Sequence, residues 1–421
     1  MNENRYKRKS FLWNAFGGGL VAFQSAALLF LAARFYDQET AGVVSIAYAL
    51  AVFVYSIGRY GMRSFQATDV LYQYSFRDYF KSRIISLLLA IVLLLCYLVL
   101  SVLWNGYSPE KCILVFEIVF LRLVNAFEDV FCGHLQRMDR FLEGARIMAI
   151  REGATLCVIM LLMVLRVDLI LAFLLAILLS IAAEGFLLGR KKSCFSEEGP
   201  RGTDKSRALL QECFPLALST AFAVYLSNVP KYVTDWYLDD TMQAIVGYLI
   251  LPVFTIALLN QFIFNPFIRE LGELYHEGDR KRFRAKIVKQ TGVILGTSAV
   301  IGILTVIVGL PLLSFLFKAD LKVYRTETIL FLIGGCLYTI QYYLTIPLTV
   351  MKKQKSMLYG FLATIAVTTL IQKRAVWSMG LRGVALVYLA ANLIMDLYMA
   401  LIFLSAYLKG RKKSGSGRLS S

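Results

Sequence analysis

Apolar segments of about 20 residues recur twelve times along this chain, and that recurrence constrains the fold more than any other feature of the sequence. At a rise of 1.5 Å per residue, such a segment crosses the roughly 30 Å hydrocarbon core of a membrane as a helix. Charged residues make up 17% of the chain, against about 25% in soluble proteins. We therefore predict an all-α polytopic membrane protein with about twelve transmembrane helices. The predicted spans are 11–34, 42–63, 82–103, 110–134, 144–165, 169–189, 212–238, 243–266, 288–310, 326–350, 356–376 and 384–408.

The longest connection between predicted spans lies at mid-chain and divides six helices from six. The predicted domains are an N-terminal lobe (1–189), a cytoplasmic linker (190–210), a C-terminal lobe (211–409) and a disordered basic tail (410–421). The halves echo each other weakly, since a Phe-Arg-Asp run at Phe76 leads into the third helix and an Asp-Arg-Lys run at Asp279 leads into the ninth. A duplication of six helices keeps both copies in one orientation, which favours a central cavity and a site at their interface.

The net charge of +17 does not indicate a nucleic-acid partner. Lysine and arginine alternate between loops, and their excess on one side follows the positive-inside pattern, which predicts that both termini are cytoplasmic. The seven cysteines are scattered without a CxxC pair, and the two histidines, His134 and His276, are too far apart to indicate a metal centre. Membrane lipids are the expected partners of such a chain.

The seventh predicted helix carries polar residues where hydrocarbon is expected. Asn228, Lys231 and Asp235 lie at i, i+3 and i+7, on one face, next to Pro230 and Tyr232. A lysine at mid-bilayer costs roughly 2.5–3.5 kcal/mol on insertion scales, so it normally faces a bundle interior or a watery cavity. One interpretation is a structural Lys231–Asp235 ion pair. We favour a cation directed at an anionic cargo.

The fourth predicted helix is the most polar span. Its charged and amide residues are Glu117, Arg122, Asn125, Glu128 and Asp129. So much charge is not expected toward lipid. It forms either a self-neutralising ion network or the lining of a hydrated cavity shared with Lys231, and we favour the cavity. The carboxylates, together with Asp235, are the candidates for binding a coupling proton or sodium ion.

Further candidates lie at the ends of the first helices. Gln24 is a polar group within the first helix, and Arg34 ends that helix on the outer side, where it either reaches to headgroups or lies at the mouth of a cavity. Arg59 and Arg63 are one turn apart at the cytoplasmic edge of the second helix. They either contact lipid phosphate or admit an anionic headgroup from the inner leaflet. Arg146, Arg151 and Glu152, at the start of the fifth helix, fit a cytoplasmic rim.

The chain contains none of the common sequence signatures of nucleotide hydrolysis or hydrolytic catalysis. There is no P-loop, no GxGxxG, no GxSxG and no HExxH. The loops predicted on the outer side are short, and the longest, around 314–325, is about a dozen residues. We therefore expect no enzyme, no catalytic residues and no cofactor, apart from proton or sodium coupling.

Several motifs, taken in order, resemble bacterial polysaccharide (O-antigen, Wzx-type) flippases of the multidrug/oligosaccharidyl-lipid/polysaccharide (MOP) exporter superfamily. They are Trp13-Asn14, Ala33-Arg34, Ala41-Gly42, Gly61-Met62-Arg63-Ser64-Phe65-Gln66, Leu135-Gln136-Arg137-Met138-Asp139-Arg140 and Asn228-Val229-Pro230-Lys231-Tyr232. The resemblance implies two six-helix lobes around a cationic cavity in the bacterial cytoplasmic membrane.

The resemblance also implies a cargo, an undecaprenyl-diphosphate-linked oligosaccharide moved from the inner to the outer leaflet by alternating access. Lys231 and Asn228 match the family's helix-seven motif and Arg34 its helix-one end, whereas the role of Arg122 is inferred from polarity alone. Other polysaccharide-assembly proteins are implied partners. The alternatives are a cation-coupled multidrug exporter of the same superfamily, a membrane-embedded polysaccharide-assembly enzyme, and a scaffold for glycan assembly that does not transport.

Overall fold

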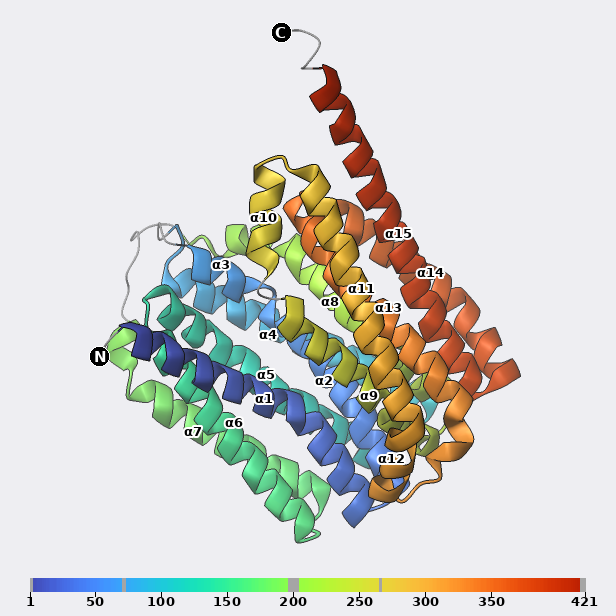
Figure 1. Cartoon of the computed structure of the whole chain (residues 1–421). Helices are drawn as coiled ribbons and strands as arrows, with labels where there is room; N and C mark the ends of the chain where they lie inside the picture. The colour runs from blue at the N-terminus through green and yellow to red at the C-terminus, as the bar shows by residue number, and fades with distance from the viewer. Residues whose placement is uncertain (1–2, 70–72, 196–203, 265–266, 417–421) are drawn as a thin grey trace. The chain divides into compact units, whose positions relative to one another are not determined.

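A computed structural model describes residues 3–69, 73–195, 204–264 and 267–416 (Figure 1). These residues contain no β-strand, so the chain is all-α over its described part. The helices are α1 (Glu3–Phe35), α2 (Gln38–Arg59), α3 (Met62–Thr68), α4 (Phe76–Asn105), α5 (Pro109–Arg137), α6 (Phe141–Val164), α7 (Leu169–Gly189), η1 (Lys192–Phe195), α8 (Ser206–Tyr237), α9 (Asp240–Phe264), α10 (Ile268–His276), α11 (Arg280–Leu304), η3 (Thr305–Gly309), α12 (Leu310–Phe317), η4 (Leu321–Tyr324), α13 (Arg325–Val350), α14 (Gln354–Met379) and α15 (Leu381–Ser416).

Each of the twelve predicted spans overlaps a long helix of the described residues, and the span 288–310 covers α11, η3 and the first residue of α12. In the described residues, ten helical stretches are long and apolar enough to cross a membrane, and the two remaining predicted spans are α5 and α14. The prediction of an all-α polytopic membrane protein is therefore confirmed. The boundary of the second predicted span differs most clearly: it runs to residue 63, but α2 ends at Arg59, where Tyr60 and Gly61 both adopt positive φ.

The described chain divides into two compact units. The first comprises Met1–Val224 with Asp239–Ala244, and the second comprises Tyr225–Leu238 with Ile245–Ser421. The predicted linker, 190–210, includes residues 196–203, which lie outside the described part. Of the predicted disordered tail, residues 410–416 continue α15 as helix and 417–421 lie outside the described residues.

Within the first unit, α1 packs along α6, and α6 packs along α7 (Figure 1). The helix α5 contacts α2, α4, α6 and α7, so the most polar helix lies at the centre of this unit. In the second unit, α13 packs against α15 and α11, and α15 also packs against α14. Three pairings occur in both halves when the six spanning helices of each half are numbered separately: third with fourth, fourth with sixth, and fifth with sixth.

Local signals fix where the helices of the first unit begin and end. Ser75 caps α4 and forms a reciprocal capping box with Asp78, which satisfies two backbone N–H groups. Gly106 ends α4 in the left-handed conformation at φ 63°. Two residues later Ser108 caps α5, and Pro109 occupies its first turn, where the missing N–H costs nothing. These turns set the register between α4 and α5, which supply one side of the site described next.

Candidate functional site

A break between α2 and α3 places two arginines beside one carboxylate of α5. Tyr60 ends α2 at φ 52° and donates its N–H to the Ser56 carbonyl, and Gly61 follows at φ 66°. Glycine tolerates this left-handed backbone at no steric cost. The break separates Arg59 on α2 from Arg63 on α3, yet both side chains reach Asp129 of α5.

Three arginines converge on Asp129. The Arg59 Nε lies 3.3 Å from Oδ2, and the Arg63 Nη1 lies 3.0 Å from Oδ1. From α4, the Arg83 Nη2 lies 3.0 Å from Oδ2. One carboxylate cannot neutralise three guanidinium groups, so the cluster carries two positive charges in excess. We call these four residues the Asp129 cluster.

The cluster is buried at one end and open at the other. The side chain of Arg83 is 0% exposed, whereas Arg59 is 38% and Arg63 is 23% exposed. Burial would lower the pKa of the Arg63 guanidinium, but the Asp129 carboxylate outweighs this, and the pKa lies above its ordinary value. The excess positive charge is therefore permanent and is presented by Arg59 and Arg63.

Arg83 anchors the cluster to α2. Its Nη1 donates to the Gly58 carbonyl, and the Ser86 hydroxyl donates to the same oxygen at 2.7 Å. A side chain at Gly58 would lie 3.2 Å from Leu123 and 3.3 Å from Leu87, so α2 approaches α4 and α5 closely here. Sequence reasoning missed Arg83, because it stands at the start of a predicted span, where a basic residue is explained by the positive-inside pattern.

A second buried network joins α5 to α6 and is neutral. Arg151 pairs with Glu128 and lies 3.4 Å from Glu152, whose carboxylate also accepts from Asn125 and lies 3.9 Å from Arg122. These two arginines and two glutamates balance one another. The expectation that Arg151 and Glu152 form a cytoplasmic rim was wrong, because both are almost fully buried.

Three charged residues of α5, the fourth predicted helix, belong to these two buried networks, and a hydrated cavity that they share with Lys231 stays a prediction. Arg122, Glu128 and Asp129 are buried and paired within the first unit. Arg122 also donates to the Val21 carbonyl at 3.1 Å and lies over the Tyr48 ring. Contact of Arg122 and Asn125 with a cargo, and ion coupling by Glu128 and Asp129, stay predictions.

Three other predicted residues of the first unit lie apart from both networks. Gln24 of α1 is buried, and its Oε1 has no hydrogen-bond partner within the described chain. Glu117 of α5 is also buried, and its Oε2 is likewise without one. Arg34, in the last turn of α1, is exposed.

The candidates of the seventh predicted helix lie in the last part of α8, which belongs to the second unit. Lys231 and Asp235 are buried, and the Lys231 Nζ lies 5.8 Å from the centroid of the Phe254 ring. The Asn228 amide donates to the Ser227 hydroxyl at 2.9 Å, and Tyr232 stacks on Tyr225. A cavity shared by Lys231 and the residues of the first unit stays a prediction, as does the role of Asp235 in ion coupling.

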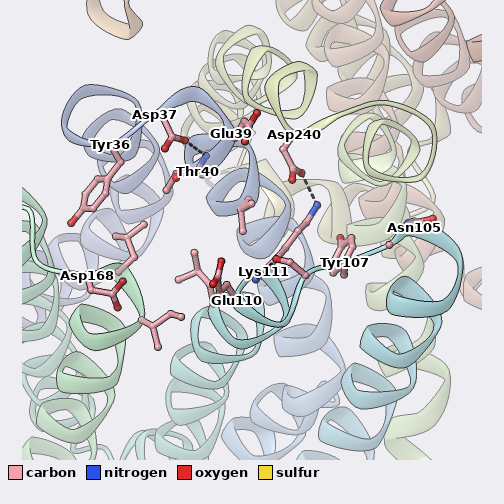
Figure 2. A pocket seen from close by; sticks show the side chains of 16 residues that line it. Tyr36, Asp37, Glu39, Thr40, Asn105, Tyr107, Glu110, Lys111, Asp168 and Asp240 are labelled. Atoms are coloured by element: carbon pink, nitrogen blue, oxygen red, sulfur yellow. Dashed lines mark hydrogen bonds and ion pairs between the residues drawn. The ribbon is translucent and has the colours of Figure 1, made fainter.

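A cavity of about 470 Å³ lies in the first unit at the opposite end of α2 (Figure 2). Its acidic lining residues are Asp37, Glu39, Glu110, Asp168 and Asp240. Among the described residues of the lining, the only basic one is Lys111, whose Nζ lies 2.6 Å from Asp240. Asp37 and Asp168 also cap α2 and α7. One end of α2 is therefore positive and the other negative, in a chain whose overall charge is strongly positive.

Comparison with known proteins identifies structures that share the fold of this chain. No family model matches the chain, and no curated protein matches it in sequence. Among solved structures, the lipid II flippase MurJ in an inward closed conformation is similar with a TM-score of 0.67 and 16% identity, over 97% of this chain and 90% of MurJ.

Two MATE transporters are similar as well. An inward-facing MATE family transporter of the MOP superfamily aligns with a TM-score of 0.63 and 13% identity, over 95% of this chain and 96% of that one. The eukaryotic MATE transporter AtDTX14 aligns with a TM-score of 0.59 and 11% identity, over 97% and 99%. The chain therefore has the polytopic helical fold that MurJ and the MATE transporters of the MOP superfamily share.

Proposed function

We propose that the protein is a flippase of the bacterial cytoplasmic membrane that moves a polyprenyl-diphosphate-linked oligosaccharide from the cytoplasmic to the outer leaflet by alternating access. The product serves cell-surface polysaccharide assembly. The Asp129 cluster is the observation that carries the proposal. Its two excess positive charges lie where Arg59 and Arg63 are partly exposed, at the end of α2 that the positive-inside pattern assigns to the cytoplasm.

The chemistry of the cluster suits a diphosphate. Arginine presents a planar fork of donors that matches phosphate oxygens in bidentate geometry. A single Asp129 carboxylate holds Arg59 and Arg63 together without cancelling their charge, and Arg83 fixes the carboxylate from the buried side. The two guanidinium groups are thus positioned before a ligand arrives, which lowers the entropic cost of binding.

Transport of this cargo requires a diphosphate and its sugars to cross about 30 Å of hydrocarbon. Unpaired burial of those charges would cost several kcal/mol or more each. The helix α2 has 22 residues and is therefore about 33 Å long. Arg59 and Arg63 favour capture of the diphosphate at one end, and the carboxylates of the 470 Å³ cavity at the other end disfavour its rebinding after transfer.

Lys231 and Asn228 complete the proposed route from the second unit, where a lysine within a spanning helix requires a partner or water. We assign Lys231 to the diphosphate or an acidic sugar and Asn228 to glycan hydroxyls. Arg122, Asn125, Arg34, Gln24 and Tyr232 are secondary candidates for the same route, and a proton or sodium ion is the proposed coupling ion.

The test is flipping in proteoliposomes. A fluorescent undecaprenyl-diphosphate oligosaccharide is placed in both leaflets, and its transfer is followed by quenching from outside. Arg59→Gln with Arg63→Gln should abolish transfer, whereas the matched double variant Arg77→Gln with Arg190→Gln, which removes two exposed arginines of the same unit, should retain it. Transfer at the wild-type rate in the first variant would overturn the proposal.

The alternative is a cation-coupled multidrug exporter, and the acidic cavity is the observation that favours it. Five carboxylates around about 470 Å³ would suit an organic cation better than a diphosphate. Drug susceptibility separates the two functions. A strain without the protein should become drug-sensitive if it exports drugs, and should accumulate lipid-linked sugar units on the cytoplasmic side if it is a flippase.

A further inference from the structure

The first turns of α11, in the second unit, form a basic surface that the proposed function does not use. The capping residue Asp279 is followed within ten positions by six basic residues: Arg280, Lys281, Arg282, Arg284, Lys286 and Lys289. Such a cluster at the end of a spanning helix attracts anionic lipid headgroups.

Part of this basic surface is already neutralised. The Arg282 Nε lies 3.4 Å from Asp279, and the Lys286 Nζ lies 2.6 Å from Glu270 of α10. No ion pair in the described part of the chain involves Lys281, Arg284 or Lys289, and all three are exposed. Three cations are therefore available to an external anion.

The helical register shows what these cations face. Lys281 and Arg284 share a stripe with Val288 and Leu295, at i, i+3, i+7 and i+14. Val288 is 63% and Leu295 is 51% exposed, whereas Phe283 on the opposite face is buried. Exposed apolar residues on a helix of a polytopic membrane protein face lipid, and Arg280–Phe317 is such a spanning stretch.

The same stripe therefore passes from lipid-facing apolar residues to cations at the edge of the bilayer. That is the depth of the phosphate groups. Binding of a soluble acidic protein would not require cations on the stripe that faces lipid. Lys281 and Arg284 are one turn apart, about 5–6 Å between Cβ atoms, which allows both to contact one phosphate.

We propose that Lys281, Arg284 and Lys289 bind the headgroup of an anionic phospholipid at this end of α11. Phosphatidylglycerol has the required chemistry, a single anionic phosphodiester anchored by acyl chains. The chains would lie along Val288 and Leu295. This lipid site is independent of the Asp129 cluster and of the cargo.

The test is retention of phosphatidylglycerol by the full chain in native mass spectrometry, after purification from an equal mixture of phosphatidylcholine and phosphatidylglycerol. A cation near a membrane surface strengthens anionic-lipid binding about fivefold, so the triple variant Lys281→Gln, Arg284→Gln, Lys289→Gln should weaken it on the order of 100-fold. Each single variant should weaken it about fivefold, which keeps the test available if the triple variant misfolds.

Two controls make the result specific. The variant Lys281→Arg, Arg284→Lys, Lys289→Arg keeps the positive charge and should retain phosphatidylglycerol as the wild type does. The variant Lys352→Gln, Lys353→Gln, Lys355→Gln removes three charges at the turn between α13 and α14 in the same unit and should also keep it. Unchanged retention in the α11 triple variant, or equal loss in the α13–α14 variant, would overturn the proposal.

Discussion

Replacing Asp129 by Asn should destabilise the first unit more than any change of an exposed charge. The substitution keeps the shape but removes the carboxylate that Arg59, Arg63 and Arg83 share. Arg83 is 0% exposed and has no other carboxylate among its hydrogen-bond partners in the described residues. Removing one partner of a buried ion pair typically costs about 3–5 kcal/mol, because the remaining charge is left buried and uncompensated.

A double-mutant cycle separates this effect from general disruption. Arg83→Met leaves Asp129 paired with Arg59 and Arg63 and should cost about 1–3 kcal/mol, the loss of charge-assisted hydrogen bonds. In the double variant the buried charge is gone, so its cost should fall below the sum of the single costs by about 1–3 kcal/mol.

The assay is reversible unfolding in mixed detergent micelles, followed by tryptophan fluorescence from the four tryptophans. All four proteins of the cycle are measured at one ionic strength, since partly exposed Arg59 and Arg63 are screened by salt and buried Arg83 is not. A cost below about 1 kcal/mol for Asp129→Asn, or costs that simply add in the double variant, would refute the account of the cluster.

Four further predictions concern the Asp129 cluster and contacts elsewhere in the two units. Arg59→Gln with Arg63→Gln should weaken polyprenyl diphosphate binding at least about 100-fold, from two hydrogen bonds of about 1.5–3 kcal/mol each, while the free energy of unfolding changes by about 1 kcal/mol or less per partly exposed arginine. Binding in nanodiscs measures the first effect and unfolding in micelles the second. Gly42→Ala should destabilise by about 1–3 kcal/mol, because its Cβ would lie 1.8 Å from the Asp240 carbonyl, whereas Gly18→Ala, with nothing within 4 Å, should not; equal unfolding curves would contradict this. Lys231→Ala should abolish flipping with normal membrane insertion, and normal flipping would remove Lys231 from the route. Lys111→Gln should cost about 1 kcal/mol or less, since the ion pair with Asp240 is partly exposed, and a larger loss in micelle unfolding would show that the pair is structurally essential.

The helices could be predicted from the sequence because membrane thickness fixes the length of an apolar segment. All twelve predicted spans overlap long helices for that reason. The end of α2 could not be placed, since Tyr60 carries no turn signal and only the adjacent Gly61 hints at the left-handed break. The second predicted span, which ends at residue 63, therefore continued through that break.

The candidate site was predictable only in part. The turn spacing of Arg59 and Arg63 pointed to a shared role at the edge of the membrane, but their convergence with Asp129 depends on how α2, α3 and α5 pack. Arg83 was missed and Arg151 was misread for one reason: a basic residue near the start of a span is usually explained by topology. Both side chains are in fact buried and paired with carboxylates, and their burial depends on neighbours far away in the sequence.

The central claim is that the Asp129 cluster captures a diphosphate, and the most direct measurement is binding of undecaprenyl diphosphate, without sugars, to the full chain in phosphatidylcholine nanodiscs. We expect saturable binding to the wild type, lost on the order of 100-fold in Arg59→Gln with Arg63→Gln and retained in Arg77→Gln with Arg190→Gln. Equal binding by all three proteins would contradict the account.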